Sequence, residues 1–212
     1  MRLYLSSSEL GNHPERLVSL AGKGSRLAVI MNALDNFPDH RERCLRTEQE
    51  ALEALGFRVE ELDLRTYFGV PDRLARVLER TEGLWVNGGN TFLLRRAMVL
   101  SGFDPIVREL LGADRLVYAG FSAGVCAAAP SLRGIEFLDE PHDVSEGYPR
   151  EPVWEGLGLI DYHVAVHYRS GPPDVEPIQR TVRYYREHGM PYVALRDGEV
   201  LVVEENATEL VR

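Results

Sequence analysis

The stretch Leu116-Val117-Tyr118-Ala119-Gly120-Phe121-Ser122-Ala123-Gly124-Val125 predicts a strand, a sharp turn and the start of a helix. A serine at such a turn needs small residues two positions before and after it, because the strand and helix backbones approach too closely for side chains. Gly120 and Gly124 meet this need. The turn exposes the Ser122 hydroxyl at a helix N-terminus, where backbone N–H groups favour developing negative charge. Ser122 is therefore the candidate nucleophile, and helix capping by the same serine is the alternative.

Short apolar runs like the one before Ser122 recur along the chain and alternate with helix-like stretches, at residues 2–5, 27–31, 58–64, 83–86 and 116–119. These runs are continuous rather than alternating, which is typical of strands covered by helices on both faces of a parallel sheet. Helices are expected over residues 39–55 and 174–188. The sequence thus predicts an α/β fold, a doubly wound, mostly parallel sheet in one domain over residues 1–212. Residues 192–204 are expected to add a C-terminal β-hairpin that turns at Asp197-Gly198.

Composition narrows the function classes. A formal net charge of −9 opposes nucleic-acid binding, which needs clustered Lys and Arg. Residues 1–8 form one short apolar strand with no long hydrophobic run behind it, so neither a signal peptide nor a membrane span is expected. The two cysteines, Cys44 and Cys126, are too few for a disulfide framework or a four-cysteine metal site. We expect a cytoplasmic protein with free thiols and no membrane partner, either a monomer or a homodimer.

A second glycine pair, Gly88-Gly89, also lies where a predicted strand ends and a helix begins. Adjacent parallel strands present their carboxyl ends at one crevice, so a backbone N–H of this pair can face a carbonyl held over Ser122. Gly89 and Ala123 are the candidate oxyanion donors, with Gly88 and Asn90 beside them as candidate substrate-binding residues. The chain lacks the Gly-x-Gly-x-x-Gly and Gly-Lys-Ser/Thr patterns at this point, which argues against a nucleotide site.

A serine nucleophile needs a base, and histidine is the usual one. Of six histidines, His167 is the best candidate, because residues 164–166 read as a buried strand whose end would bring the imidazole to the crevice. His163 is the second candidate. It shares a strand face with His167, and with Asp161 it allows a metal site, but no third histidine or cysteine stands at ligand spacing nearby.

The third member of a catalytic triad is a carboxylate that orients the imidazole. Asp139 is the expected acid, because it follows the apolar residues 135–138 and would stand at a strand end facing the crevice. Glu140 and Asp143 are alternatives further into the same loop. A solvated acidic loop is the other interpretation of all three residues, since charged side chains are mostly exposed.

Three segments together resemble the peptidase E family of aspartyl dipeptidases, whose fold is similar to class I glutamine amidotransferase domains. They are Val86-Asn87-Gly88-Gly89-Asn90-Thr91-Phe92, the Gly120 to Gly124 turn, and Val166-His167-Tyr168. Their order and spacing agree with the family, and the resemblance covers most of the chain. It implies a Ser-His-acid peptidase that acts on short peptides without metal or cofactor.

One departure concerns substrate choice. The family's recognition of an N-terminal aspartate depends on an arginine downstream of the histidine, and in this chain the position falls near Pro177. Arg169 and Arg180 are the nearby candidates to replace it. We therefore expect a peptidase without strict Asp-Xaa specificity, because an unpaired buried carboxylate in the substrate would be heavily penalised.

Three rival functions remain open at this point. One is a non-catalytic binding domain that keeps the amidotransferase-like fold. Another is glutamine amidotransfer, which would place a cysteine at the turn, whereas here the turn carries serine and Cys126 follows one helical turn later. The third is a cyanophycinase-like serine hydrolase that cuts a special polymer.

Overall fold

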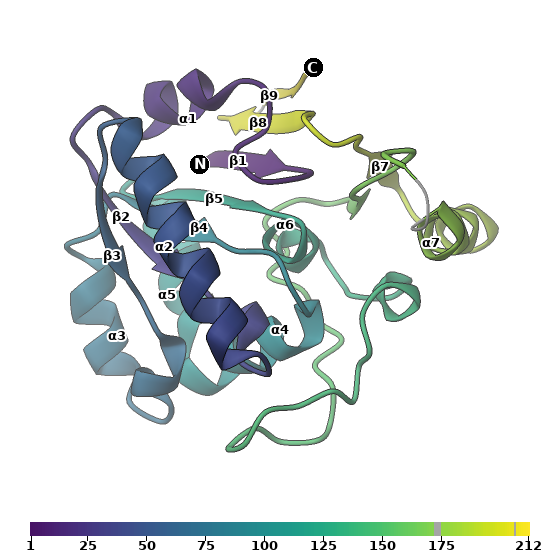
Figure 1. Cartoon of the computed structure of the whole chain (residues 1–212), viewed down its shortest axis with the longest axis horizontal. Coiled ribbons are helices and arrows are strands. Elements are labelled where there is room, and N and C mark those ends of the chain that lie inside the picture. The colour runs from purple at the N-terminus through teal and green to yellow at the C-terminus, as the bar shows by residue number, and fades with distance from the viewer. Residues whose placement is uncertain (172–174, 206) are drawn as a thin grey trace.

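The computed structural model describes residues 1–171, 175–205 and 207–212 (Figure 1). Its strands are β1 (Arg2–Ser6), β2 (Arg26–Ile30), β3 (Arg58–Glu61), β4 (Gly83–Val86), β5 (Val117–Phe121), β6 (His163–Ala165), β7 (Tyr192–Ala194), β8 (Val200–Glu204) and β9 (Ala207–Val211). Its α-helices are α1 (Pro14–Ala21), α2 (Pro38–Ala54), α3 (Pro71–Leu78), α4 (Thr91–Ser101), α5 (Phe103–Gly112), α6 (Ala123–Ala128) and α7 (Val175–Glu187). Short 3₁₀ helices are η1 (Asn32–Leu34), η2 (Leu64–Tyr67) and η3 (Ile135–Phe137). Within these ranges, no helix combines the length and the apolar character that a membrane crossing requires.

The main sheet has seven strands in the order β3-β2-β4-β5-β1-β8-β9. The five strands from β3 to β1 pair in parallel, and β8 pairs antiparallel with both β1 and β9. The doubly wound, mostly parallel sheet expected from the apolar runs is confirmed.

The C-terminal hairpin exists, but it is formed by β8 and β9 rather than by two strands around Asp197-Gly198. The strands on either side of that dipeptide belong to different sheets, since β7 pairs with β6 while β8 pairs with β1 over five residues. The tight turn at Asp197-Gly198 is present, closed by the Glu199 N–H donating to the Arg196 carbonyl oxygen at 3.0 Å, but the hairpin expected around it is wrong. Five paired residues join β8 to β1 in the main sheet, whereas the three residues of β7 pair with β6 in the small sheet.

Side chains alternate between two apolar cores along the strands. In β1, Leu3 and Leu5 face the core shared with α3, α4, α5 and α6, and Tyr4 faces the core shared with α1 and α2. Figure 1 shows α2 lying across the front of the sheet. Helices on both faces are what continuous apolar strands require, because both surfaces of the sheet must be buried.

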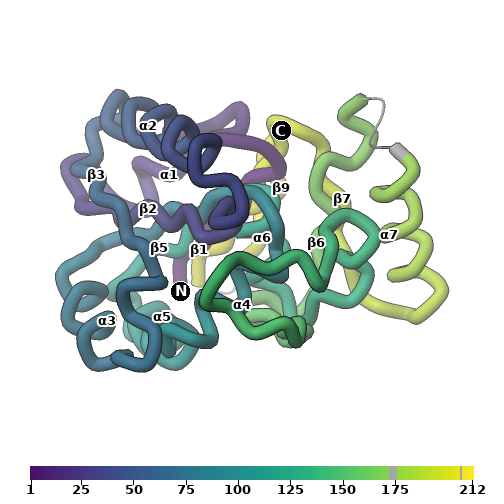
Figure 2. The backbone as a smooth tube through the Cα atoms, turned by 60° about the horizontal axis from the view of Figure 1, so that its bottom comes forward, coloured from purple at the N-terminus to yellow at the C-terminus, as the bar shows by residue number. Residues whose placement is uncertain are grey.

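A smaller unit formed by β6, β7 and α7 lies beside the main sheet. The two strands pair in parallel, and Ala165 of β6 packs with Val182 and Tyr185 of α7. Figure 2 shows this unit at the opposite end of the molecule from β3 and α3. The helix expected over residues 174–188 corresponds to α7, and Pro172, Pro173 and Asp174 lie outside the described residues.

Candidate active site

Ser122 lies at a sharp turn between β5 and α6, with φ of 49° and ψ of −110°. A Cβ on Gly120 would lie 2.5 Å from the Val86 carbonyl oxygen, and a Cβ on Gly124 would clash with the same oxygen. Both glycines are therefore needed for β4, β5 and α6 to approach one another. The Ser122 side chain makes no capping hydrogen bond to α6, so its conformation is not that of a simple N-cap.

The Ser122 hydroxyl and the His167 ring are within hydrogen-bond distance, with Ser122 Oγ 3.0 Å from His167 Nε2. The other ring nitrogen, Nδ1, lies 2.6 Å from Oδ1 of Asp197. A carboxylate accepts hydrogen bonds, so this contact assigns the proton to Nδ1 and leaves the Nε2 lone pair facing the serine. The three side chains have the connectivity of a Ser-His-acid triad.

The carboxylate that meets His167 belongs to Asp197, which corrects the expectation that Asp139 would do so. Residues 135–137 form the 3₁₀ helix η3 rather than a strand, and this shorter path brings Asp139 to the start of α4. There Oδ2 of Asp139 accepts the Thr91 backbone N–H at 2.8 Å. Burial raises the pKa of the Asp139 carboxyl, against the lowering effect of hydrogen bonds from the Thr91 side chain and backbone and of the nearby His167. Among the described contacts, neither Glu140 nor Asp143 meets the His167 ring. A Glu140 side-chain oxygen instead accepts the His142 N–H.

Asp197 could have been found by the same reasoning that selected His167, because it follows a short apolar strand whose end faces the crevice. The predicted hairpin assigned Asp197 to a turn, so its position at a strand end was not used to identify the acid. In the structure Asp197 is held at both ends, since its backbone N–H donates to Ser170 Oγ at 2.8 Å and its Oδ1 also receives the Ser7 hydroxyl at 3.1 Å. Ser7, at the end of β1, accepts the His167 backbone N–H at 2.8 Å.

The Gly88-Gly89 loop lies directly beside the nucleophile. A Cβ on Gly88 would be 3.1 Å from Ser122 Cβ, and Gly89 has φ of 135°, with a Cβ position blocked by the Ala33 carbonyl oxygen. Among the described residues, the backbone N–H groups of Gly89 and Ala123 have no hydrogen-bond acceptor. Two free amides next to Ser122 are the arrangement that an oxyanion needs.

Asn90 has a structural part in this loop. Its side-chain oxygen accepts the Leu93 N–H and caps α4, and its amide nitrogen donates to the Glu140 carbonyl oxygen at 3.0 Å. Both polar groups of Asn90 are therefore occupied by the protein itself. They tie the start of α4 to the loop that carries Asp139.

Two other side chains considered from the sequence are engaged elsewhere. His163 is buried, with Nε2 3.1 Å from Ser131 Oγ and Nδ1 3.3 Å from the Pro191 carbonyl oxygen, and burial lowers the pKa of its ring. Cys126 is buried in α6 with its thiol directed at the Val164 carbonyl oxygen, and burial raises the pKa of that thiol. A thiol of raised pKa is a poor nucleophile, which argues against glutamine amidotransfer through Cys126.

Two hollows flank the Ser122–His167 pair. The first, the Asp139 cavity, has a volume of about 210 Å³ and is lined by Thr91, Ala123 and Asp139, with Ile135, Leu138 and Ile178 as its main apolar walls. The second, the α2 groove, has a volume of about 460 Å³ and runs between α2, through His40, Arg43 and Glu48, and the Gly88-Gly89 loop. A molecule bound across Ser122 would extend into both.

Comparisons with known proteins identify the family of the chain. A protein of Drosophila melanogaster named probable alpha-aspartyl dipeptidase is 32% identical over 95% of this chain and 82% of its own length. Peptidase E of Streptomyces coelicolor is 32% identical over 85% of this chain and 69% of its own. The crystal structure of a Listeria monocytogenes EGD-e protein matches 100% of this chain and 98% of its own, with a TM-score of 0.80 at 24% identity, and supports the fold. The family model for peptidase family S51 matches residues 4–211, so this chain belongs to that peptidase family.

Proposed function

We propose that the chain hydrolyses dipeptides or other short peptides through an acyl-enzyme on Ser122. The observation that carries this proposal is the continuous path from Ser122 Oγ through the His167 ring to Asp197, with contacts of 3.0 and 2.6 Å. Membership of peptidase family S51 supports the reaction class, and the dipeptidase named in Drosophila supports a short substrate.

In the proposed mechanism, the Ser122 oxygen attacks the peptide carbonyl carbon while its proton passes to Nε2 of His167. The N–H groups of Gly89 and Ala123 bind the oxyanion that forms. His167 then returns the proton to the leaving nitrogen as the C–N bond breaks. Water, activated by the same imidazole, hydrolyses the ester and restores Ser122. Asp197 holds the ring in the required tautomer throughout.

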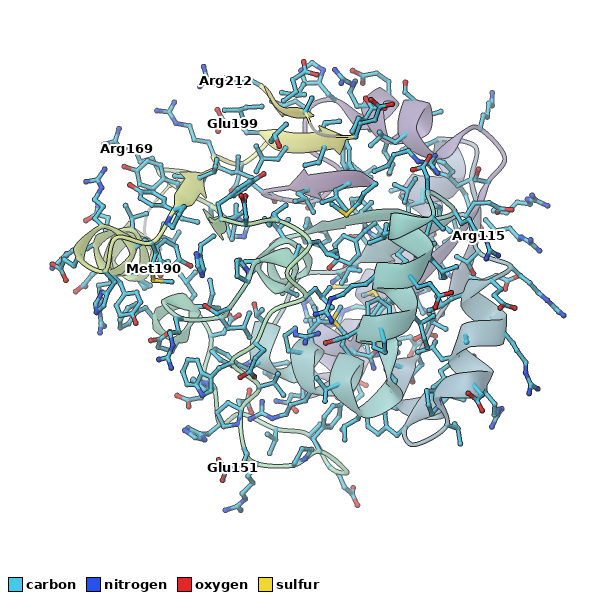
Figure 3. All side chains as sticks on the ribbon, turned by 180° about the vertical axis from the view of Figure 1, so that it is seen from behind. Arg115, Glu151, Arg169, Met190, Glu199 and Arg212 are labelled. Atoms are coloured by element: carbon cyan, nitrogen blue, oxygen red, sulfur yellow. The ribbon has the colours of Figure 1, made fainter. Side chains whose placement is uncertain are left out.

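Strict specificity for an N-terminal aspartate is not part of the proposal. Pro177, where the family arginine was expected, lines the Asp139 cavity, and the described lining contains no Lys or Arg. The two arginines considered as replacements contact aromatic rings outside this lining. The Arg180 guanidinium lies 4.6 Å from the centre of the Phe137 ring, and that of Arg169 lies 5.0 Å from the centre of the Tyr168 ring. Figure 3 shows Arg169 at the periphery of the molecule.

We also propose that residues 1–212 act as one domain, since the three triad residues come from both sheets. A cytoplasmic location is supported by the two unpaired cysteines, and a substrate other than nucleic acid is supported by the net charge of −9. Nothing in the site requires a second copy of the chain, so both a monomer and a homodimer fit the proposal.

The direct test treats wild type and Ser122→Ala with a fluorophosphonate probe and a dipeptide and tripeptide library. Wild type is expected to be labelled once, at Ser122, and to release free amino acids. Ser122→Ala is expected to lose labelling and to lose kcat by roughly 10⁴-fold or more, because the members of a triad act as a unit.

The chain offers a matched control in Ser131, whose hydroxyl also meets a histidine, with Ser131 Oγ 3.1 Å from His163 Nε2. That pair has no carboxylate on the second ring nitrogen, so Ser131→Ala should keep labelling and turnover. Unlabelled wild type would favour a non-catalytic binding domain. Labelling with cleavage of an Arg-bearing polyaspartate alone would favour a cyanophycinase-like hydrolase.

A further inference from the structure

Asp139 is not the carboxylate that contacts His167, but it lies in the small cavity next to the nucleophile. It lines the same hollow of about 210 Å³ as Ser122 and His167. Within the described part of the chain its hydrogen bonds come from Thr91 alone, from the backbone N–H to Oδ2 at 2.8 Å and from the side chain. One side of the carboxylate is therefore available to a molecule in the cavity.

No Lys or Arg among the described residues neutralises this carboxylate, and the cationic group that acts on it is the His167 ring. Among the described residues, Asp139 makes no ion pair with Lys or Arg, although the chain pairs other half-buried acids, such as Asp104 with Arg95 at 2.7 Å. The other walls of the cavity are largely apolar, through Ile135, Leu138 and Ile178. An unpaired carboxylate in such surroundings is costly, so a cationic partner that enters the cavity would be bound favourably.

The loop that carries Asp139 is fixed rather than left to solvent. The buried Arg96 guanidinium of α4 donates to three carbonyl oxygens of this loop, those of Pro141, Arg150 and Glu151, at 2.6, 2.8 and 3.1 Å. Figure 3 shows Glu151 at the lower edge of the molecule, so the arginine spans the loop from its start beside the site to its outer end. A carboxylate held this firmly can fix the position of a ligand.

We propose that Asp139 binds the α-ammonium group of the peptide's N-terminal residue, whose uncharged side chain occupies the apolar end of the same cavity. This inference rests on the proposed function. The cavity is smaller than the roughly 300–1,000 Å³ of pockets for drug-sized ligands, which fits one residue and not a longer stretch of chain. The enzyme would therefore cut after the first residue, with the rest of the substrate in the α2 groove.

The test compares two substrates that differ only in the amine, Leu-Ala and 4-methylpentanoyl-alanine, by the rate of alanine release. Wild type is expected to prefer Leu-Ala by about 100-fold or more in kcat/KM, as for a desolvated charge pair. In Asp139→Asn, which keeps an acceptor for the Thr91 N–H, this preference should fall at least tenfold, mainly through KM. The thermal unfolding midpoint of the variant confirms that it is folded.

Asp143→Asn is the matched control, because it is the same change in the same loop at a residue that does not line the cavity. It should keep the wild-type preference. Equal losses on both substrates in Asp139→Asn, or no loss on either, would overturn the ammonium site while leaving the proposed function intact. A folded wild type that fails to react with the fluorophosphonate probe and to cleave any dipeptide would instead overturn the proposed function.

The pH dependence gives a second readout. A protonated Asp139 cannot pair with an ammonium group, and burial raises the pKa of this carboxyl against the Thr91 hydrogen bonds and the facing His167, with the Cys126 thiol also nearby. Because His167 acts on both substrates alike, its own protonation leaves the preference unchanged. The preference of wild type for Leu-Ala should therefore be full at neutral pH and should decline as the pH falls through that raised pKa. A preference that stays constant into the acid range would contradict the proposal.

Discussion

Asp197 receives two donors on one carboxylate oxygen, the His167 ring N–H at 2.6 Å and the Ser7 hydroxyl at 3.1 Å. Its side chain is 42% exposed, so the carboxylate is partly solvated. The electrostatic benefit of the pair is therefore reduced by solvent, and orientation of the ring is the larger part of what Asp197 provides.

Asp197→Asn tests this assignment at the scale of one residue. An amide at this position can donate to Nδ1, which favours the tautomer that carries its proton on Nε2 and cannot accept from Ser122. We expect kcat to fall by about 100-fold or more, equally for Leu-Ala and for 4-methylpentanoyl-alanine. Fluorophosphonate labelling should slow to the same extent. Wild-type labelling in Asp197→Asn, with loss in Asp139→Asn, would restore Asp139 as the triad acid.

Two site residues could be predicted from the sequence because each has a local signal, a steric one for Ser122 and a strand end for His167. Ser122 stands between two glycines that only a sharp turn demands, and His167 follows a short apolar strand. Asp197 was missed because Asp-Gly predicted a hairpin turn; the turn is present, but what brings Asp197 to His167 is the pairing of β7 with β6. That pairing joins residues far apart in sequence, which local patterns do not encode.

At the scale of an element, the Gly88-Gly89 loop depends on the side chain before it. Asn87 is 3% exposed, and its amide nitrogen donates to the Gly88 carbonyl oxygen at 3.0 Å. That carbonyl belongs to the same planar peptide unit as the Gly89 N–H, so fixing one end fixes the other. Asn87 thereby orients a proposed oxyanion donor without itself binding the substrate.

Asn87→Ala should release this peptide plane and lower kcat by roughly ten- to 100-fold, less than the loss of a donor itself, with a smaller change in KM. Asn90→Ala, in the same loop, removes the α4 cap and should lower the free energy of unfolding by about 1 kcal/mol. Steady-state kinetics and urea unfolding of both variants separate the two effects. A kcat for Asn87→Ala no lower than that for Asn90→Ala would refute the orienting role.

At the scale of the whole molecule, the site is assembled from two units that the sequence presented as one sheet. Ser122 and the oxyanion loop belong to the seven-stranded sheet, whereas His167 and Asp197 follow the two strands of the small sheet. The layers of the main sheet were predictable, because buried parallel strands are continuously apolar. The separate small sheet was not, since its three-residue strands resemble any short apolar run.

Ser7 connects these two units, which makes it the place to test how firmly the site is held together. Its hydroxyl is fully buried at the end of β1, accepts the His167 backbone N–H at 2.8 Å, and lies 3.3 Å from the Leu195 carbonyl oxygen. Ser7→Ala leaves a half-buried N–H without its acceptor, at a cost of about 1–3 kcal/mol, and frees the segment that carries the imidazole.

We therefore expect Ser7→Ala to slow fluorophosphonate labelling at least tenfold and to lower the thermal unfolding midpoint. The matched control is Ser6→Ala. Ser6 is the equally buried last residue of β1, next to Ser7, and its hydroxyl donates to the Ser8 carbonyl oxygen and not to the small sheet. It should lower the midpoint and leave the labelling rate close to that of wild type. Equal labelling rates in the two variants would mean that β6, β7 and α7 hold His167 in place without Ser7.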